Sequence, residues 1–338
     1  MIIDCFPAFD EFKLAKFRIS YLSSIVNLTV IGEGNLTHAG SAREEIWTDF
    51  FYQEIQQNKV IVMPIDISNV DTPMGRDVSQ REQLVEWVCK TFPDSFYIIS
   101  DLDEIPSKAQ IIEATSKVRS VHFLSPTYFR FANWLTVDSH KDWSRGVISH
   151  TSLEPGANAG RFNKNLEVVR LNPGCHLSYV GKDYEAIARK YTEFAHQEFN
   201  FPLAKSRDFL EYSDKHVIDH LGRFESPGFG LLNILSQDNF NEIQQLLFVC
   251  NPEFFYQKQI PARPQRIFAS LVISTICLLQ NSFLRKEVYD TFILKQTTRT
   301  NWIAYPTIVY ALFRLTFRKV KGYRKRLIMG GFFMLFRN

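Results

Sequence analysis

Short apolar runs alternate with amphipathic segments over the first hundred residues, and this alternation limits the possible folds more than any other feature. Runs typical of buried strands lie at residues 1–6, 27–31, 60–67 and 96–100. Helical spacing of apolar residues is found between them, at 11–22 and 79–89. Because strands that alternate with helices form parallel sheets covered by helices, we expect an α/β fold of the nucleotide-binding kind.

The fourth apolar run ends in three carboxylates, Asp101, Asp103 and Glu104. Such close like charges repel and are costly to bury, so a cation that neutralises them is expected. In an extended segment Asp101 and Asp103 would project to one side, with Leu102 turned to the core. Ligands in open α/β sheets bind beyond the carboxyl ends of strands, so we predict Mg²⁺ or Mn²⁺ here. The alternative is a solvated turn that begins a helix at residues 107–116.

A second polar segment lies downstream. His176 begins a short predicted strand, and residues 183–196 have the spacing of a helix. Glu193 and His196 are three residues apart and would share a face of this helix, while Glu198 lies at or beyond its end. Each histidine is a candidate ligand, although a histidine in a single sequence is more often a core or surface residue than a ligand.

Aromatic rings are interleaved with polar side chains between residues 121 and 170, around Trp134. Aromatic faces beside fixed polar groups suit a sugar ring, which presents apolar C–H faces and equatorial hydroxyls. We therefore predict a sugar-binding wall in this region. An ordinary amphipathic hairpin is the alternative interpretation.

At 338 residues, with 45% hydrophobic residues, the chain is long enough for one large core or two smaller ones. Its five cysteines are scattered and lack metal-binding spacing, which argues against a disulfide framework and a structural zinc site. The N-terminus has an acid at Asp4 and no basic region before an apolar one. We therefore expect no signal peptide and a cytoplasmic protein.

The C-terminal end differs from the rest of the chain in charge. No acid follows Asp290, whereas ten lysines and arginines do. From Trp302 onward apolar residues recur at helical spacing, which predicts a basic amphipathic helix on an anionic membrane surface. A helix packed on the core is the alternative, and no nucleic acid is expected because no binding module accompanies the basic run. The apolar run at 269–279 is about half of the length that spans a bilayer.

Four strings of the sequence, taken in order, resemble glycosyltransferase family 17, whose best-known members are the animal β-1,4-mannosyl-glycoprotein β-1,4-N-acetylglucosaminyltransferases. The strings are IIDCFPAFDEFKLAKFRISYL, ISDLDEIP, GCHLSYVG and FAHQEFN, and together they cover roughly residues 1–201. The resemblance implies a GT-A-like fold, a UDP-sugar donor such as UDP-GlcNAc, a divalent metal, and inversion at the anomeric carbon.

The resemblance also implies roles for individual residues. The metal would be held by Asp101, Asp103 and His176, and His196 is the alternative to His176 as a ligand or a phosphate contact. The donor sugar nucleotide would be met by Asp4, Cys5, Phe6, Glu33, Arg81, Asp101, Leu102 and Asp103. The acceptor would be met by Glu104, Trp134, His176 and His196. Inversion needs a base for the acceptor hydroxyl, and Glu198, then Glu193, are the candidates. Cys175 stands where the family usually has an aromatic residue.

We therefore expect a catalytic region at 1–250, with a nucleotide-sugar half at 1–120 and an acceptor half at 121–250, followed by a membrane-associated region at 251–338. The expected activity is metal-dependent transfer of N-acetylglucosamine or a related sugar to a glycan or a lipid-linked saccharide, by a cytoplasmic protein attached peripherally to the membrane. A metal-dependent nucleotidyltransferase or phosphohydrolase is the alternative, but CFPAFDEF offers no phosphate-binding loop after the first strand. A catalytically inactive membrane-surface binding protein is a third possibility.

Overall fold

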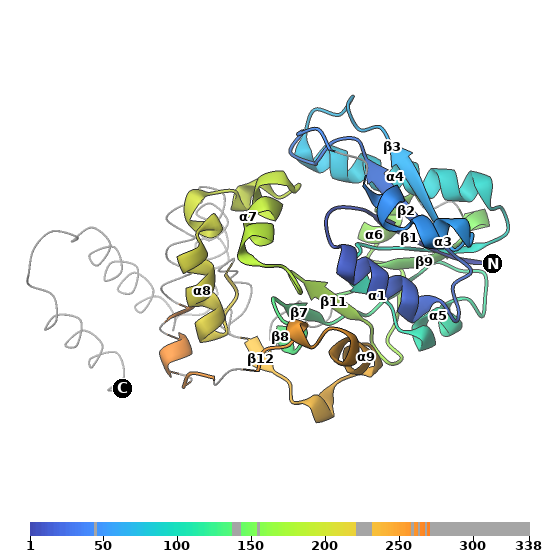
Figure 1. Ribbon diagram of the computed structural model, residues 1–338. Coiled ribbons are helices and arrows are strands. Elements are labelled where there is room, and N and C mark those ends of the chain that lie inside the picture. Colours follow the sequence, from blue (N-terminus) through green and yellow to red (C-terminus); the bar gives the residue numbers. More distant parts are fainter. Residues whose placement is uncertain are drawn as a thin grey trace, which may run out of the picture.

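The computed structural model describes residues 1–43, 46–136, 143–153, 156–220, 232–257, 260–262, 264–267 and 269–270. The chain has an α/β fold with two mixed sheets and helices packed around them (Figure 1). In the described ranges no helix is both long and apolar enough to cross a bilayer. The predicted basic helix after Trp302, and nearly all of the apolar run at 269–279, lie outside the described residues.

The larger sheet contains all four strands predicted for the N-terminal part. Its order is β10 (Glu167–Val169), β6 (Val121–Phe123), β9 (Val147–His150), β4 (Phe96–Ile99), β1 (Ile2–Pro7), β2 (Leu28–Gly34) and β3 (Val60–Ile65). Strands β4, β1, β2 and β3 run parallel, which confirms the prediction for this half. Strand β9, however, runs antiparallel to both β4 and β6, so the sheet is mixed. Since β6, β9 and β10 lie after residue 120, the two predicted halves share this sheet.

Helices cover both faces of the larger sheet. They are α1 (Phe12–Leu22), α2 (Trp47–Phe50), α3 (Tyr52–Gln56), α4 (Pro73–Thr91), α5 (Lys108–Ala114) and α6 (Ala157–Phe162). Strand β1 directs Ile3 and Cys5 into the core under α4, and Phe6 into the core under α1. Helix α4 begins earlier than the predicted residue 79, because the Thr72 hydroxyl accepts a hydrogen bond from the Gly75 N–H at 3.1 Å.

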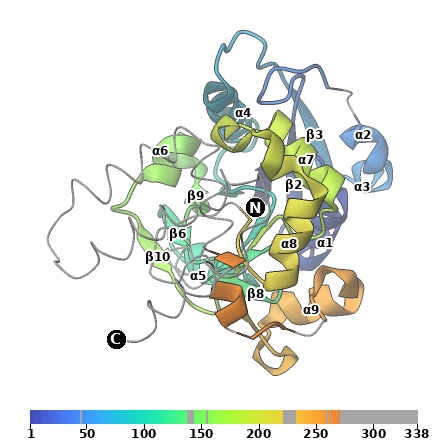
Figure 2. The ribbon, with the colours of Figure 1, turned by 90° about the vertical axis from the view of Figure 1, so that its left-hand side faces the viewer.

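The smaller sheet has the order β12 (Leu232–Ile234), β8 (Trp134–Thr136), β7 (Thr127–Phe129), β11 (Cys175–Ser178) and β5 (Glu104–Ile105). The predicted strand near His176 is therefore confirmed as β11. Around this sheet lie α7 (Tyr184–Glu193), α8 (Arg207–His216) and α9 (Glu242–Cys250), with α7 and α8 packed together (Figure 2). Short 3₁₀ helices lie at Thr151–Leu153, Gln197–Phe199, Pro202–Lys205, Gln237–Asn239 and Pro252–Phe254.

Helix α7 ends earlier than the sequence predicted. It begins after Asp183, whose carboxylate accepts from the Ala186 N–H at 2.7 Å, and it ends at Glu193. Phe194 is extended and packs its ring 5.5 Å from that of His38. His196 therefore lies outside the helix, and the prediction that it shares a helical face with Glu193 is wrong.

Candidate functional site

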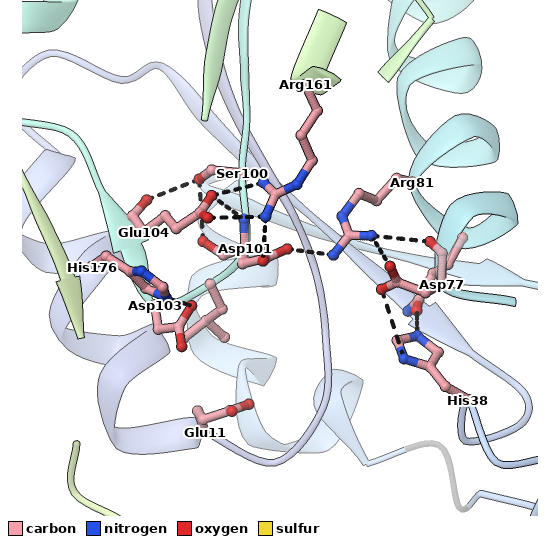
Figure 3. A network of polar contacts seen from close by, with 12 residues as sticks. Glu11, His38, Asp77, Arg81, Ser100, Asp101, Asp103, Glu104, Arg161 and His176 are labelled. Atoms are coloured by element: carbon pink, nitrogen blue, oxygen red, sulfur yellow. Dashed lines mark hydrogen bonds and ion pairs between the residues drawn. The ribbon is translucent and has the colours of Figure 1, made fainter. Parts of the chain in front are cut away.

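The acidic segment connects the two sheets at the carboxyl end of β4. Strand β4 of the larger sheet ends at Ile99, and Glu104 already belongs to β5 of the smaller sheet. The Glu104 N–H donates to the Asp101 carbonyl at 2.9 Å, so these residues form a turn and not the extended segment that was predicted. Leu102 is buried as expected. Figure 3 shows that Asp101 points toward two arginines, whereas Asp103 points toward His176.

Asp101 is held by two arginines from different helices. Its Oδ1 lies 2.5 Å from Arg81 Nη2 of α4, and its Oδ2 lies 2.7 Å from Arg161 Nη2 of α6 (Figure 3). Burial opposes the charge on Asp101, but the Arg161 and Arg81 guanidiniums outweigh burial and hold the pKa of this carboxyl well below its usual range. Arg81 also pairs with Asp77, one helical turn earlier.

Glu104 is fully buried and saturated with hydrogen bonds. It accepts from Arg161 at 2.9 and 3.0 Å, from the Trp143 indole at 2.6 Å and from the Asp101 N–H at 3.1 Å. These contacts fix the positions of Arg161 and Trp143. Glu104 was predicted to bind substrate, but the structure places it behind those residues, where it orients them.

Asp103 is buried, and no side chain or backbone group in the described ranges donates a hydrogen bond to its carboxylate. Its Oδ1 lies 3.8 Å from His176 Nε2, and its Oδ2 lies 4.0 Å from Lys190 Nζ of α7. Burial raises the pKa of Asp103, and the nearby His176 and Lys190 only partly offset that effect. Asp103 is thus a desolvated carboxylate with two nitrogen groups close to it but not bonded to it.

His176 is fixed by its position in β11. In the smaller sheet it pairs with Glu104 on one side and Thr127 on the other. Its Nδ1 lies 3.0 Å from the Thr127 hydroxyl, and its ring lies 5.0 Å from that of Trp143. With Nδ1 engaged, Nε2 is the ring nitrogen that faces Asp103.

Asp103 and His176 fit a shared divalent cation. A carboxylate oxygen and a ring nitrogen 3.8 Å apart can both ligate Mn²⁺ or Mg²⁺, and no group among the described residues donates a hydrogen bond to this carboxylate. Asp101, the third predicted ligand, has both oxygens engaged by arginines. Within the described part of the chain no three His, Cys, Asp or Glu side chains converge as a metal site. The ion would therefore take two protein ligands and complete its coordination with water or phosphate.

Two buried lysines add positive charge beside Asp103. Lys190 Nζ lies 3.1 Å and Lys182 Nζ lies 3.2 Å from Glu11, which follows β1. Burial opposes ionisation of Glu11, but these lysines outweigh it and hold its pKa well below the usual value. Lys182 also pairs with Asp10. The carboxyl ends of β1 and β4 thus face a set of cations from α7 and its N-terminal loop.

The two candidate bases occupy different environments. Glu193 accepts from the Thr37 hydroxyl at 2.8 Å, which ties α7 to the loop after β2. Glu198 Oε1 lies 2.7 Å from His196 Nδ1, and the side chains of this pair are 26% and 50% exposed. The hydrogen bond to Glu198 raises the pKa of His196. Burial acts to raise the pKa of Glu198, but the hydrogen bond from His196 outweighs burial, so the pKa of that carboxyl falls. Glu198 is therefore a partly exposed carboxylate whose charged form His196 favours.

Four residues assigned to the donor lie inside the protein. Asp4 is fully buried and bonded by Arg18, while Cys5 and Phe6 are core side chains. Glu33 is buried and accepts from the backbone N–H groups of residues 46 and 47 at 3.1 and 3.3 Å. Their positions support the strands beneath the site. They offer no surface to a nucleotide in this structure.

Trp134 lies away from any surface. It is fully buried, with its ring centre 4.5 Å from that of Phe131 and 4.8 Å from that of Tyr256. Its ring therefore has no open face for a sugar. Trp143 of the same region is instead the aromatic residue next to the acidic turn, through Glu104 and His176.

Sequence analysis missed three basic residues that shape the site, Arg18, Arg161 and Lys190. For two of them the sequence contains a pattern that indicates a buried charge. Lys190 follows Ile187 by three residues and Arg18 follows Leu14 by four, so each lies on the buried face of its helix. A charged residue on such a face implies a buried partner. Arg161 lies in a short helix without such spacing, and no comparable signal marks it.

Comparison with protein-family models and with curated proteins found no match for this chain. The site is therefore described by its own geometry: a buried carboxylate facing a histidine, next to two arginines, at the carboxyl end of a central parallel strand.

Proposed function

We propose that this chain is a metal-dependent inverting glycosyltransferase with a GT-A-like fold, which uses a UDP-sugar donor. The observation that carries the proposal is the buried Asp103 carboxylate, which accepts no hydrogen bond from the described residues and lies 3.8 Å from His176 Nε2. It lies where α/β sheets bind nucleotides, at the carboxyl end of β4. The resemblance of four strings to glycosyltransferase family 17 supports UDP-GlcNAc as donor and a glycan or lipid-linked saccharide as acceptor.

The residues of the site suit the departure of a nucleoside diphosphate. A divalent ion held by Asp103 and His176 would neutralise charge that develops on the leaving diphosphate. Arg81 and Arg161 present guanidinium groups at Asp101, and such groups bind phosphate oxygens in the same fork geometry. Glu198, ionised and partly exposed, is the group proposed to accept the proton of the acceptor hydroxyl.

We also propose that the basic segment after Asp290 attaches the enzyme peripherally to the membrane on the cytoplasmic side. Ten bases without an acid support this proposal, since each base near an anionic surface contributes about 1 kcal/mol. Co-sedimentation of the full chain with phosphatidylserine vesicles tests it. Binding that is lost at high salt and on neutral vesicles is expected, while equal binding to neutral vesicles would contradict it.

Isothermal titration with UDP and UDP-GlcNAc tests the catalytic proposal. Mn²⁺ should enhance binding to the wild-type chain, and EDTA should remove the enhancement. Asp103→Asn should abolish the effect of Mn²⁺, whereas Asp71→Asn, which alters an exposed carboxylate, should keep it. Binding that is the same with Mn²⁺ and EDTA, or that keeps its Mn²⁺ dependence in Asp103→Asn, would overturn the assignment of this site.

A further inference from the structure

The two arginines at the site already hold an anion, and that anion is part of the protein. Each oxygen of Asp101 accepts from a different guanidinium, at 2.5 Å from Arg81 and 2.7 Å from Arg161. A carboxylate held by two guanidiniums is arranged as a phosphate would be. Both arginines are more than nine-tenths buried, and the Arg81 Nε has no hydrogen-bond partner among the residues that the structure describes. The arginines thus form an enclosed anion site that Asp101 occupies.

The local charge limits how a diphosphate can enter this site. Three carboxylates, those of Asp77, Asp101 and Glu104, share the two guanidiniums. A diphosphate brings further negative charge. It therefore cannot bind to the two arginines as long as Asp101 occupies them and has no other cation to pair with. The nearest place for such a cation is beside Asp103 and His176.

We propose that Asp101 is an exchangeable anion: it fills the phosphate site of Arg81 and Arg161 in the ligand-free protein, and a diphosphate displaces it toward the divalent cation. The divalent cation in this inference rests on the proposed function, whereas the anion site formed by the two arginines does not. In the exchange the arginines pass from a carboxylate to phosphate oxygens, and Asp101 passes from the arginines to the metal. Asp101, Arg81 and Arg161 each keep a partner of opposite charge at both stages.

Metal and diphosphate then bind as coupled ligands. The diphosphate frees Asp101 for the metal, and the metal keeps Asp101 away from the arginines. Thermodynamic linkage requires the same coupling factor in both directions, and such factors are typically about 5- to 150-fold. The cation alone should therefore bind weakly, because one of its three expected ligands is already engaged.

The first arm of the test uses inorganic pyrophosphate in EDTA, so that neither metal nor nucleoside contributes. Asp101→Asn removes the competing charge, so this variant should bind pyrophosphate at least about fivefold more tightly than the wild type. Asp103→Asn is the matched control, because Asp103 contacts neither arginine in the structure. It should gain less than Asp101→Asn. Equal or weaker binding by Asp101→Asn, including no binding by any variant, would overturn the exchange.

The second arm titrates Mn²⁺ alone. Arg161→Gln and Arg81→Gln each release one oxygen of Asp101, so each should bind Mn²⁺ about fivefold or more tightly than the wild type. Two variants are used because Arg161 also holds Glu104, and its loss can affect folding. Arg119→Gln removes an arginine that pairs with Glu167 away from the site, and it should leave Mn²⁺ affinity unchanged. Unchanged Mn²⁺ affinity in both site variants would contradict the exchange.

The two arms separate this inference from the proposed function. If Asp101→Asn gains pyrophosphate affinity while no variant binds UDP with Mn²⁺, the exchange stands and the glycosyltransferase proposal fails. If the wild type binds UDP with Mn²⁺ while Asp101→Asn gains nothing in EDTA, the proposed function stands and the exchange fails.

Discussion

Arg18 holds Asp4 in a fully buried ion pair, with Nη2 2.6 Å from Oδ1 and Nε 2.9 Å from Oδ2. The same guanidinium donates to the carbonyls of residues 101, 102 and 104 at 2.8, 3.1 and 3.0 Å, and to the Ser100 hydroxyl at 2.9 Å. Helix α1 and strand β1 thus fix the backbone of the acidic turn from within the core. The conformation of that turn depends on a residue more than eighty positions earlier in the chain.

Arg18→Met should lower the free energy of unfolding by about 3–5 kcal/mol, because it leaves Asp4 buried and unpaired. Adding Asp4→Leu removes that charge but should not restore wild-type stability. The Leu102 carbonyl still loses the donor that Arg18 supplies, at about 1–3 kcal/mol, whereas the carbonyls of residues 101 and 104 keep bonds from the Glu104 N–H and the Ser100 hydroxyl. Urea unfolding of the single and double variants measures both effects.

Arg119→Met serves as the control for Arg18. It removes an ion pair whose side chains are 25% and 61% exposed, so its cost should stay below about 1 kcal/mol. Recovery of wild-type stability by the double variant would mean that Arg18 serves only to pair Asp4. In that case the carbonyl contacts would contribute little.

The sequence predicted the long elements and two short strands, β4 and β11, but not short strands such as β5 and β9. Strands β1 to β4 follow from apolar runs, and helices α1, α4 and α7 follow from the apolar spacing of one buried face. Strands of two to four residues, such as β5 and β9, are too short to show a period. Their partners and direction are set by tertiary packing. Helix α7 was extended too far because Ala195 continues the helical spacing after Tyr191, although Phe194 has already left the helix.

The position of the acidic segment at the end of a parallel strand was predictable, but the arginines that bind Asp101 were not. Asp101 and Asp103 follow an apolar strand, and the end of a parallel strand is where such a fold binds ligands. The expected neutralising cation was a metal. In the structure Arg81 and Arg161 neutralise Asp101, and Arg161 comes from a helix sixty residues away. Pairing over that distance leaves no pattern in a single sequence.

Gly174 should not tolerate a side chain. A Cβ there would lie 2.2 Å from the Ile105 carbonyl oxygen and 3.0 Å from the Pro106 Cα, and backbone atoms cannot move aside cheaply. Gly32→Ala meets the Cδ1 of Ile65 at 2.8 Å instead, and that side chain can shift. We expect Gly174→Ala to cost about 3 kcal/mol and Gly32→Ala about 1 kcal/mol in urea unfolding.

The comparison of these two alanine variants also tests the register of β5 and β11, which places His176 opposite Glu104. Gly174→Ala should weaken Mn²⁺-dependent UDP binding in the fraction that remains folded, because it separates these strands. Equal stability of the two variants would show that the Gly174 turn relaxes more easily than its contacts indicate.

The ion pair of His196 and Glu198 should stabilise the fold over a limited pH range. The pKa of His196 is raised above its ordinary 6.5, so its contribution is full below that value and is lost as pH rises through the folded pKa. The pKa of Glu198 is lowered below 4.5, so its contribution is full above that value and is lost at lower pH. The contribution is therefore greatest between pH 4.5 and 6.5.

Denaturation of the wild type and of His196→Gln at pH 5.5 and 8.5 measures this window. The wild type should exceed the variant by more at pH 5.5 than at pH 8.5, because His196 loses its proton at the higher pH. In a Glu198→Gln background the same change should show no such pH dependence. A difference that is larger at pH 8.5 would exclude an ionic pair.

Glu198 and Glu193 can be distinguished as bases by replacing each with glutamine. Glu193→Gln keeps an oxygen that accepts from the Thr37 hydroxyl, so it should leave both UDP affinity and turnover close to wild type. Glu198→Gln should preserve Mn²⁺-dependent donor affinity but lower turnover by about 10²- to 10⁴-fold, the range that general base catalysis contributes. Release of UDP in the presence of acceptor measures turnover, and titration measures affinity. Because a structural role would change affinity and stability as well, a loss confined to turnover identifies Glu198 as the base, whereas a loss confined to Glu193→Gln transfers that role to Glu193.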